Sequence, residues 1–226
     1  MRAGRLPLDD AVELTRTGDL WLFRGSSPAD QAIRITTNSP VNHVGMAVTI
    51  EDLPPLMWHA ELGRSLPDLW SGDRHRGVQL HDLRDAAQVW AHRYGQRAWL
   101  RQLELPGGPD EQQAMEDAVL RTIARLDGTP FPSTARLALR WLGGRTARVR
   151  RRSAPDDDGS TRLETAYCAE VVAVTYAAMG LLPAGRAPNW YDPGRFWSGD
   201  DLHLLLGARL GAEIEVVAPM EDGGSA

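Results

Sequence analysis

Short apolar runs in the first part of the chain have the length and spacing of β-strands. One run, at 20–23, follows a Gly-Asp turn signal, and two more, at 44–50 and 56–61, flank a turn containing Glu, Asp and Pro. Apolar runs this short, bounded by turn residues, predict buried strands, and the last two are close enough to form a hairpin. Weaker patterns predict strands at 78–80, 97–105 and 212–217.

Apolar residues at helical spacing predict helices, most clearly in the second half of the chain. Between 109 and 126, Met115, Val119 and Ile123 share one face. A helix at 167–180 would end at Gly180. Shorter helices are expected at 29–35, with Ser27 as its cap and Pro28 in its first turn, and at 134–142 and 202–210.

Strands and helices are therefore mixed along the chain, without an internal repeat or a convincing linker. This organisation predicts one α+β domain spanning 1–226, with its core between about 18 and 217. The segment 145–160 has a basic half and an acidic half, which is typical of a solvated, mobile loop. Residues 219–226 are expected to form a frayed tail.

Composition narrows the classes of function. Of 226 residues, 42% are apolar, which is enough for a real core, and the net charge of −5 (25 − 30) argues against a general nucleic-acid or anionic-membrane binder. The N-terminal ten residues lack the apolar stretch of a signal peptide, and no run approaches the ~18 apolar residues of a membrane span. A cytoplasmic protein is the default expectation, while export without a cleaved signal stays open.

Cys168 is the only cysteine, and it stands where a helix is predicted to begin. Thr165 is a plausible N-cap, which would place Cys168 in the first turn. There the helix dipole favours the thiolate, the nucleophilic form of cysteine, and a neighbouring histidine would complete its activation. The alternative reading is a small, buried hydrophobic residue, as free cysteines often are.

His43 opens a predicted strand whose odd positions are small, leaving room for another element on that face. On the next strand, His59 and Glu61 share one face because strand side chains alternate. A turn centred near residue 51 would pair His43 with His59, whereas one centred near 53 would place Glu61 diagonally to it. Either residue could therefore orient the imidazole of His43.

The other histidines, at 75, 81, 92 and 203, have no ligand-like spacing. No pair matches a zinc motif, and one cysteine excludes a thiolate-rich metal site. No phosphate-binding loop or Gly-x-Ser-x-Gly elbow is present either. We expect neither a metal ion nor a cofactor.

Four motifs in order resemble the circularly permuted branch of the NlpC-type papain-like cysteine hydrolases, in particular the YiiX/YaeF-like group, and more distantly the lecithin-retinol-acyltransferase-like enzymes. They are the Gly-Asp-led strand at 18–23, the Asn-His-Val-Gly strand at 42–48, the Trp-His-Ala segment at 58–60 and the Tyr-Cys-Ala-Glu segment at 167–170. The Gly-Thr-Pro-Phe turn at 128–131 also resembles a turn of this family.

The resemblance implies a permuted papain-like fold, with a curved antiparallel sheet packed on the helix that bears the cysteine. Cys168 would attack an acyl carbonyl, His43 would be its base, and His59 would orient His43. Two positions depart from the family pattern. The YiiX-like group tends to have Glu at the position of His59, whereas the acyltransferase-like branch has His there, as this chain does. Ala169 replaces a Ser that is frequent in the family.

The expected partner is a peptide, small-molecule or lipid-like acyl substrate. Asp19 and Tyr167 are candidates to line its cleft, together with the aromatic residues Trp190, Tyr191 and Trp197 of a Pro- and Gly-rich loop. Equally, these aromatic residues could simply cover the core. The alternatives to a hydrolase are an acyltransferase and a non-catalytic binding module with the same fold. Nucleic-acid or membrane binding through the arginines of 145–152 is a weaker alternative.

Overall fold

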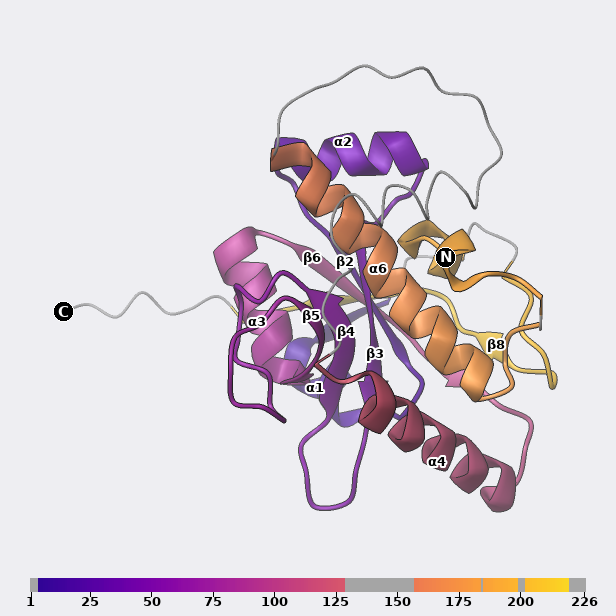
Figure 1. Ribbon diagram of the computed structural model, residues 1–226. Coiled ribbons are helices and arrows are strands. Elements are labelled where there is room, and N and C mark those ends of the chain that lie inside the picture. Colours follow the sequence, from indigo (N-terminus) through magenta and orange to yellow (C-terminus); the bar gives the residue numbers. More distant parts are fainter. Residues whose placement is uncertain (1–3, 129–156, 184, 199–201, 220–226) are drawn as a thin grey trace.

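A computed structural model describes residues 4–128, 157–183, 185–198 and 202–219 (Figure 1). Strands and helices are mixed along the chain, as the sequence pattern predicts for an α+β protein. The elements are β1 (Arg5–Pro7), α1 (Leu8–Glu13), β2 (Leu20–Arg24), α2 (Pro28–Thr37), β3 (His43–Val48), β4 (Leu56–Glu61), β5 (Gly77–Asp82), α3 (Leu83–Tyr94), β6 (Arg97–Arg101), β7 (Leu103–Glu104), α4 (Pro109–Leu126), α6 (Asp157–Ala178), the 3₁₀ turns η1 (Pro188–Trp190) and η2 (Pro193–Phe196), β8 (Arg209–Leu210) and β9 (Ile214–Val217).

One seven-stranded sheet, in the order β1-β9-β6-β2-β3-β4-β5, organises the fold, and β7 pairs with β8 in a small second sheet. All pairings in the large sheet are antiparallel except that of β1 with β9. The hairpin predicted from the two apolar runs is formed by β3 and β4. It continues into β5, so three strands that are consecutive in the sequence lie side by side.

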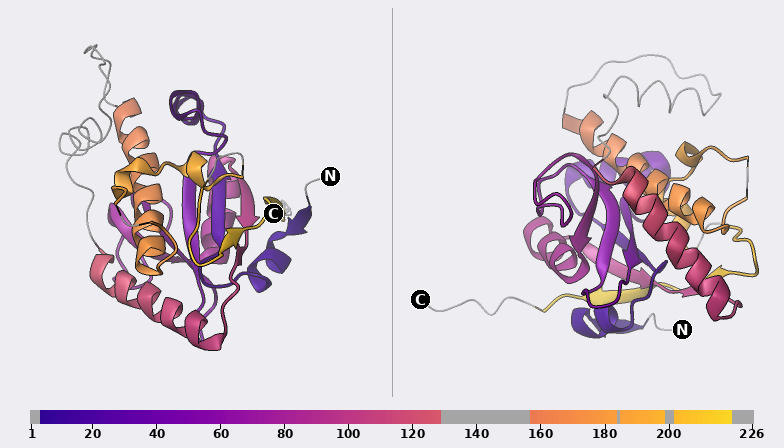
Figure 2. Two further views of the ribbon diagram at one scale, coloured as in Figure 1. Left: turned by 90° about the vertical axis from the view of Figure 1, so that its right-hand side faces the viewer. Right: turned by 60° about the horizontal axis from the view of Figure 1, so that its bottom comes forward.

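The sheet separates two buried layers because its side chains alternate between its faces. Even-numbered residues of β3 and β4, such as Val44 and Trp58, pack in one layer with α6. Odd-numbered residues, such as Ala47 and Met57, pack in the other layer with α1 and α3. The left-hand view of Figure 2 shows α6 and α4 on one side of the sheet and α1 on the other.

Two predicted helices are confirmed, the first with its boundaries, while α2 continues to Thr37, two residues beyond its predicted end. Helix α4 spans Pro109–Leu126, and α2 begins at Pro28 with the hydroxyl of Ser27 accepting the backbone N–H of Asp30. The predicted strands at 78–80, 97–105 and 212–217 correspond to β5, to β6 with β7, and to β9. The predicted helix at 134–142 lies outside the described residues.

Other expectations were wrong. The segment 202–210 is not a helix: it turns at Leu206, which has a positive φ of 56°, and ends in the short strand β8. Helices α1 and α3 were not predicted. Helix α3 begins where the side chain of Asp82 accepts the backbone N–H of Asp85 and ends at Gly95, so its caps were visible in the sequence although its small apolar stripe was not.

Helix α6 begins at Asp157, ten residues before the predicted start. Cys168 therefore lies in the middle of the helix, not in its first turn. Thr165, the expected N-cap, is an interior position of the helix. The last four residues of the loop expected at 145–160 are helical, while 145–156 lie outside the described residues, as do 220–226 of the expected tail.

Gly45 allows β3 and β4 to approach closely on the α3 side of the sheet. A Cβ at this position would overlap the sulfur of Met57 and lie 3.4 Å from the Cβ of His59. We therefore expect Gly45→Ala to lower the free energy of unfolding by roughly 1–3 kcal/mol through overpacking. Urea unfolding measures the change. Gly4→Ala, whose Cβ would meet its nearest atom at 3.9 Å, is the control, and an equal loss in both variants would contradict this account.

Candidate functional site

Three buried histidines and a glutamine form a continuous row of hydrogen bonds under α3. Nε2 of His43 lies 3.2 Å from Nδ1 of His59, and Nε2 of His59 lies 2.9 Å from Nδ1 of His81. The row continues from Nε2 of His81 to Oε1 of Gln79, at 3.1 Å. His59 and Gln79 are fully buried, His81 is 1% exposed and His43 is 6% exposed. His43 is therefore the most exposed member of the row. We call these four side chains the histidine row.

Strand alternation and register place these side chains in one line. His43, His59, Gln79 and His81 have odd numbers on three adjacent strands, and all point into the layer of α3. His59 pairs directly with Gln79 and Met57 pairs with His81, so His81 lies diagonally to His59. Diagonal neighbours on one face of a sheet are within reach of long side chains.

The register between β3 and β4 differs from both alternatives considered above. Met46 pairs with Trp58 and Val48 with Leu56, and continuing this register would place Glu61 directly opposite His43. The side chains nevertheless bring His59 to His43. Glu61 turns instead to the hydroxyl of Ser65, which lies 2.5 Å from its Oε2. The structure therefore joins His43 with His59, and Glu61 closes the loop after β4.

Trp90 of α3 covers the row from above the sheet. Its ring meets those of His43 and His59 edge-on, with centroid distances of 4.6 Å and 5.0 Å. Phe23 of β2 packs edge-on against Trp90 and contacts His43 from the side. The small residues on this face of β3 do leave room for another element, as the sequence predicts, and that element is α3.

Burial keeps the histidines neutral. Desolvation, with a smaller effect from His81, lowers the pKa of His43 to about 3, and it lowers the pKa of His59 well below its usual value. The pKa of His81 falls to about 4, again through desolvation, although the nearby Asp68 opposes the shift. Burial raises the pKa of Glu61, while its hydrogen bonds to Ser65 work in the opposite direction.

A second polar network fixes the residue before His43. The Oδ1 of Asn42 accepts the backbone N–H of Gly25 at 2.7 Å, and its Nδ2 donates to Asp30 at 2.9 Å. The other oxygen of Asp30 bonds the hydroxyl of Ser27 at the start of α2. Asn42 therefore ties the beginning of β3 to β2 and α2, which restrains the backbone that carries His43.

Cys168 lies in the other layer. It is fully buried, among the side chains of α6 and the even-numbered residues of β3 and β4. Helix α6 packs against both strands, so its cysteine and the two histidines belong to neighbouring elements. The strand backbone nevertheless separates the layer that holds the sulfur from the layer that holds the histidine row.

The residues expected to line a cleft have other surroundings. Asp19 is fully buried at the start of β2, where its carboxylate accepts the backbone N–H groups of Leu103 at 2.7 Å and Arg16 at 2.9 Å. The backbone of Asp19 bonds that of Ala47, near the C-terminal end of β3, whereas His43 is at the other end of this strand. Asp19 therefore stabilises the junction of β2 with the start of β7.

The aromatic loop packs on the α6 side of the sheet. Tyr191 is 3% exposed and stacks on Phe196, which is fully buried. Half-buried Trp197 meets Trp99 edge-on at 5.4 Å, and the guanidinium groups of two arginines lie over the ring of Trp190. Tyr167 is also in this layer and is 9% exposed. The loop thus covers the core beside α6, in the same layer as Cys168.

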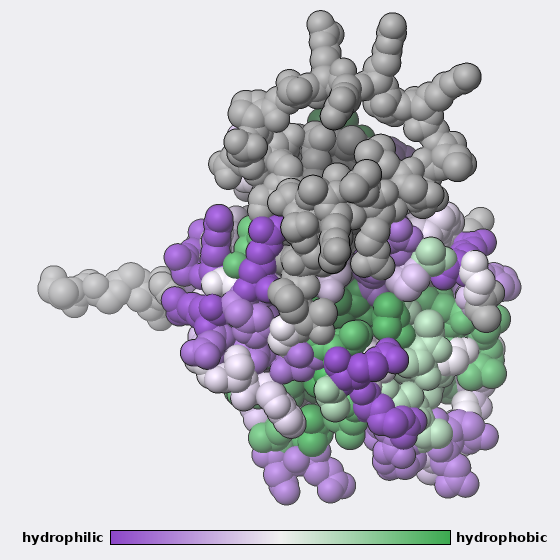
Figure 3. Space-filling model, in the orientation of Figure 1, coloured by the Kyte–Doolittle hydropathy of each residue, from purple (hydrophilic) through white to green (hydrophobic). Residues whose placement is uncertain are grey.

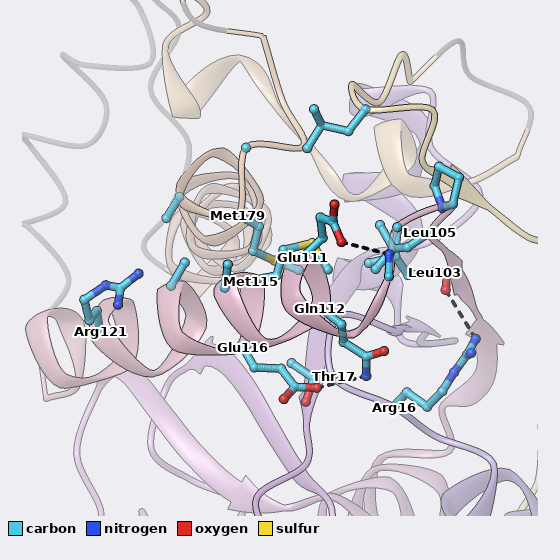
Figure 4. A pocket seen from close by; sticks show the side chains of 18 residues that line it. Arg16, Thr17, Leu103, Leu105, Glu111, Gln112, Met115, Glu116, Arg121 and Met179 are labelled. Atoms are coloured by element: carbon cyan, nitrogen blue, oxygen red, sulfur yellow. Dashed lines mark hydrogen bonds between the residues drawn. The ribbon is translucent and has the colours of Figure 1, made fainter.

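An open groove of about 650 Å³ lies between α4 and the C-terminal part of α6 (Figure 4). Leu103, Leu105, Met115 and Met179 form its apolar lining, and charged residues of α4 and Arg16 surround it. In Figure 3 apolar side chains gather in this part of the molecule. Met179 follows Cys168 by about 16 Å along the helix axis, so the groove lies away from the cysteine.

Within the described residues, no three or more His, Cys, Asp or Glu side chains are grouped as metal ligands would be. In the histidine row the ring nitrogens face one another in pairs and do not converge on one point. The described helices also include none with the length and apolarity needed to cross a bilayer.

Sequence reasoning missed His81 and Gln79. Both stand on the predicted strand at 78–80 or next to it, and their odd numbers place them on the same face as each other. The signal was the alternation of polar residues on β5, next to a strand that also has a histidine on one face. Ligand spacing was the wrong criterion, because these side chains bond one another.

Comparisons with known proteins give little beyond this geometry. No family model and no curated protein matches the sequence. Among solved structures, the chain is similar to the crystal structure of metalloprotein YiiX from Escherichia coli O157:H7 (DUF1105), with 22% identity over 74% of this chain and 68% of that chain, and a TM-score of 0.43. Values this low do not establish a shared family, and the word metalloprotein describes YiiX alone.

The buried neutral histidines predict acid sensitivity. Their pKa values are lower in the folded chain than the ~6.5 of an unfolded histidine, so below that pH the unfolded state binds more protons. Stability should fall as pH decreases from about 6.5 to 5, by up to about 1.4 kcal/mol per pH unit for each histidine. Urea unfolding at several pH values measures this slope.

The variant His81→Gln should reduce the slope, whereas His203→Gln, at an exposed position, is the control and should leave it unchanged. Asp19 and Glu61 have raised pKa values, which work in the opposite direction, but they do so equally in wild type and variants, so the difference in slope between the proteins isolates the histidine. Equal slopes in wild type and His81→Gln would contradict the prediction.

Proposed function

We propose that the protein is a cysteine-dependent acyl hydrolase in which Cys168 is the nucleophile, His43 is the general base and His59 orients His43. The observation that carries the proposal is the bond from Nε2 of His43 to His59 at 3.2 Å. It fixes the imidazole and leaves Nδ1 as the nitrogen that can exchange a proton with a nucleophile. A base held by a third group is the arrangement that nucleophilic catalysis requires.

In the proposed reaction, Nδ1 of His43 takes the proton from the thiol of Cys168. The thiolate attacks the acyl carbonyl carbon, and the imidazolium then protonates the departing amine or alcohol. Water attacks the resulting thioester after giving its proton to the same nitrogen, which releases the acid and restores the thiol. Throughout the cycle His59 holds the other nitrogen of His43.

The position of Cys168 places a condition on this proposal. The sulfur is buried in the α6 layer, and the histidine row is in the α3 layer. His43 is the first residue of β3, so we propose that the two groups meet at this end of the strand. The proposed cycle therefore includes a movement that exposes the sulfur and brings it to Nδ1.

The type of reaction depends on which molecule attacks the acyl-enzyme. With water the enzyme is an amidase, peptidase or thioesterase, and with an amine or alcohol it is an acyltransferase. His59 at the position of the third residue is compatible with either outcome, because its role is to hold His43. An amide or ester with a peptide or lipid-like acyl group is the proposed substrate class.

The second candidate function is a non-catalytic binding module. Two observations favour it: Cys168 is fully buried, and it lies in the middle of α6 away from the helix dipole's positive end. In that case Cys168 is a small core residue, and the histidine row satisfies polar groups that the fold buries.

The rate of Cys168 alkylation by iodoacetamide, followed from pH 4 to 10, separates these functions. For the hydrolase we expect alkylation with an apparent pKa below the ~8.5 of a free thiol, because a thiolate beside His43 offsets the desolvation that otherwise keeps this imidazole neutral, and the two form an ion pair. In His43→Ala the apparent pKa should return to that of a free thiol or higher. Intact-protein mass spectrometry measures the rate, and Cys168→Ser is the blank, since this is the only cysteine.

Hydrolysis of activated esters is measured in the same variants, with His203→Ala as a matched control for loss of an exposed histidine. We expect Cys168→Ser to lose at least a thousandfold in kcat/KM and His203→Ala to retain it. An unreactive thiol whose behaviour is the same in wild type and His43→Ala, together with no ester hydrolysis, would reject the hydrolase in favour of the binding module.

A further inference from the structure

The direction of every hydrogen bond in the histidine row follows from one end of it. Gln79 has an amide group that can donate only from Nε2 and accept only at Oε1. Its Nε2 bonds the backbone carbonyl oxygen of His75, which is only an acceptor. The amide is thereby oriented with Oε1 toward His81, which lies 3.1 Å away at Nε2.

The constraint passes from ring to ring. Nε2 of His81 must carry a proton to donate to Oε1 of Gln79. A neutral imidazole then has a bare Nδ1, which accepts a hydrogen bond from the Nε2–H of His59 at 2.9 Å. The bare Nδ1 of His59 in turn accepts from Nε2 of His43 at 3.2 Å. Each ring is therefore protonated on Nε2, and the last bare nitrogen is Nδ1 of His43.

We propose that Gln79 is a positioning residue that sets the tautomers of His81, His59 and His43 and so leaves a lone pair on Nδ1 of His43. A flipped amide would reverse the row: Nε2 of Gln79 would donate to His81, and every proton would move to Nδ1. That arrangement would place the Oε1 lone pairs against the carbonyl oxygen of His75. The carbonyl thus selects one of two possible rows.

The consequence for catalysis rests on the proposed function, whereas the tautomers themselves rest on the hydrogen bonds alone. In the selected row, His43 can accept a proton at Nδ1. In the reversed row, Nδ1 already has a proton, and the acceptor Nε2 is buried against His59. Gln79 acts through two other side chains, without contact with the reacting atoms, because it is fully buried on β5.

Nitrogen-15 NMR of the histidine rings in the full chain tests the inference without any substrate, because protonated and bare ring nitrogens have well-separated chemical shifts. At pH 7.5 we expect Nε2 to be protonated and Nδ1 to be bare in His43, His59 and His81. Single replacements of the exposed His92 and His203 by Gln help to assign the signals. A proton on Nδ1 of His43 or His59 in the wild-type protein would overturn the proposal.

Two variants of similar size then isolate the amide. Gln79→Leu removes the acceptor, so the protons are no longer held at Nε2, and we expect a second tautomer to appear at His81 and His59. Gln79→Glu in its protonated form can donate its O–H to the carbonyl oxygen of His75 and keep an accepting oxygen toward His81, and in that form it should keep the wild-type tautomers. Unchanged tautomers in a folded Gln79→Leu variant would overturn the role of Gln79.

Ester hydrolysis in these variants shows which proposal fails, the cysteine hydrolase or the tautomers of the histidine row. We expect Gln79→Leu to lose about ten- to a hundredfold in kcat/KM, as losses of supporting hydrogen bonds commonly do, and Gln79→Glu to rescue most of it. Wild-type tautomers as described, combined with turnover that persists in Cys168→Ser, would reject the cysteine mechanism and retain the row. The opposite combination would reject the row and retain the hydrolase.

Discussion

The bond between His59 and its two neighbours is the interaction on which the centre of this structure depends. His59 is fully buried, and both of its ring nitrogens are used, one with His43 and one with His81. An imidazole in an apolar layer without partners would cost several kcal/mol, because burial removes its bonds to water. The strands β3, β4 and β5 supply those partners from within the sheet, and this fixes their side chains in one row.

The same burial gives the row its chemical character. Burial disfavours the protonated form of all three histidines, and the nearby Asp68 offsets this only in part at His81, so the rings stay neutral over the ordinary pH range. Neutral rings have one donor and one acceptor each, and such groups can be joined only in a directed sequence. Trp90 closes the layer above them, which protects this order from exchange with solvent. The hydrogen bonds that satisfy the buried histidines are therefore the same ones that would orient His43 as a base.

The sequence predicted the elements with clear periodicity and missed those that depend on tertiary packing. The hairpin of β3 and β4 and the helix at 109–126 follow from alternation and helical spacing, whereas the sequence left open whether His59 or Glu61 meets His43. Helix α3 buries two alanines between Leu83 and Trp90, which makes a weak apolar stripe, so only its caps marked it. The start of α6 depends on residues whose polar sequence resembles a loop, and the segment 202–210 follows the packing of its neighbours at the expense of its helical pattern. His81 and Gln79 enter the site through the register of β5, which no local pattern encodes.

The separation of Cys168 from the histidine row by one sheet is the feature that any function must accommodate. For a hydrolase the first residue of β3 is the place where the two layers can communicate, and the network of Asn42 and Asp30 holds that place in position. For a binding module, Cys168 and His43 never have to meet. The two functions therefore differ in whether the sulfur and Nδ1 of His43 ever act together.

Trapping of an acyl group is the most direct measurement of that difference. The wild-type protein and His43→Ala are mixed with an activated acetyl ester, quenched in acid within the first turnover and examined by peptide mass spectrometry. The account predicts an acetyl group on Cys168 that forms rapidly and then disappears in the wild-type protein, and that does not form in His43→Ala. The absence of acylation in both proteins, or equal acylation in both, would contradict it.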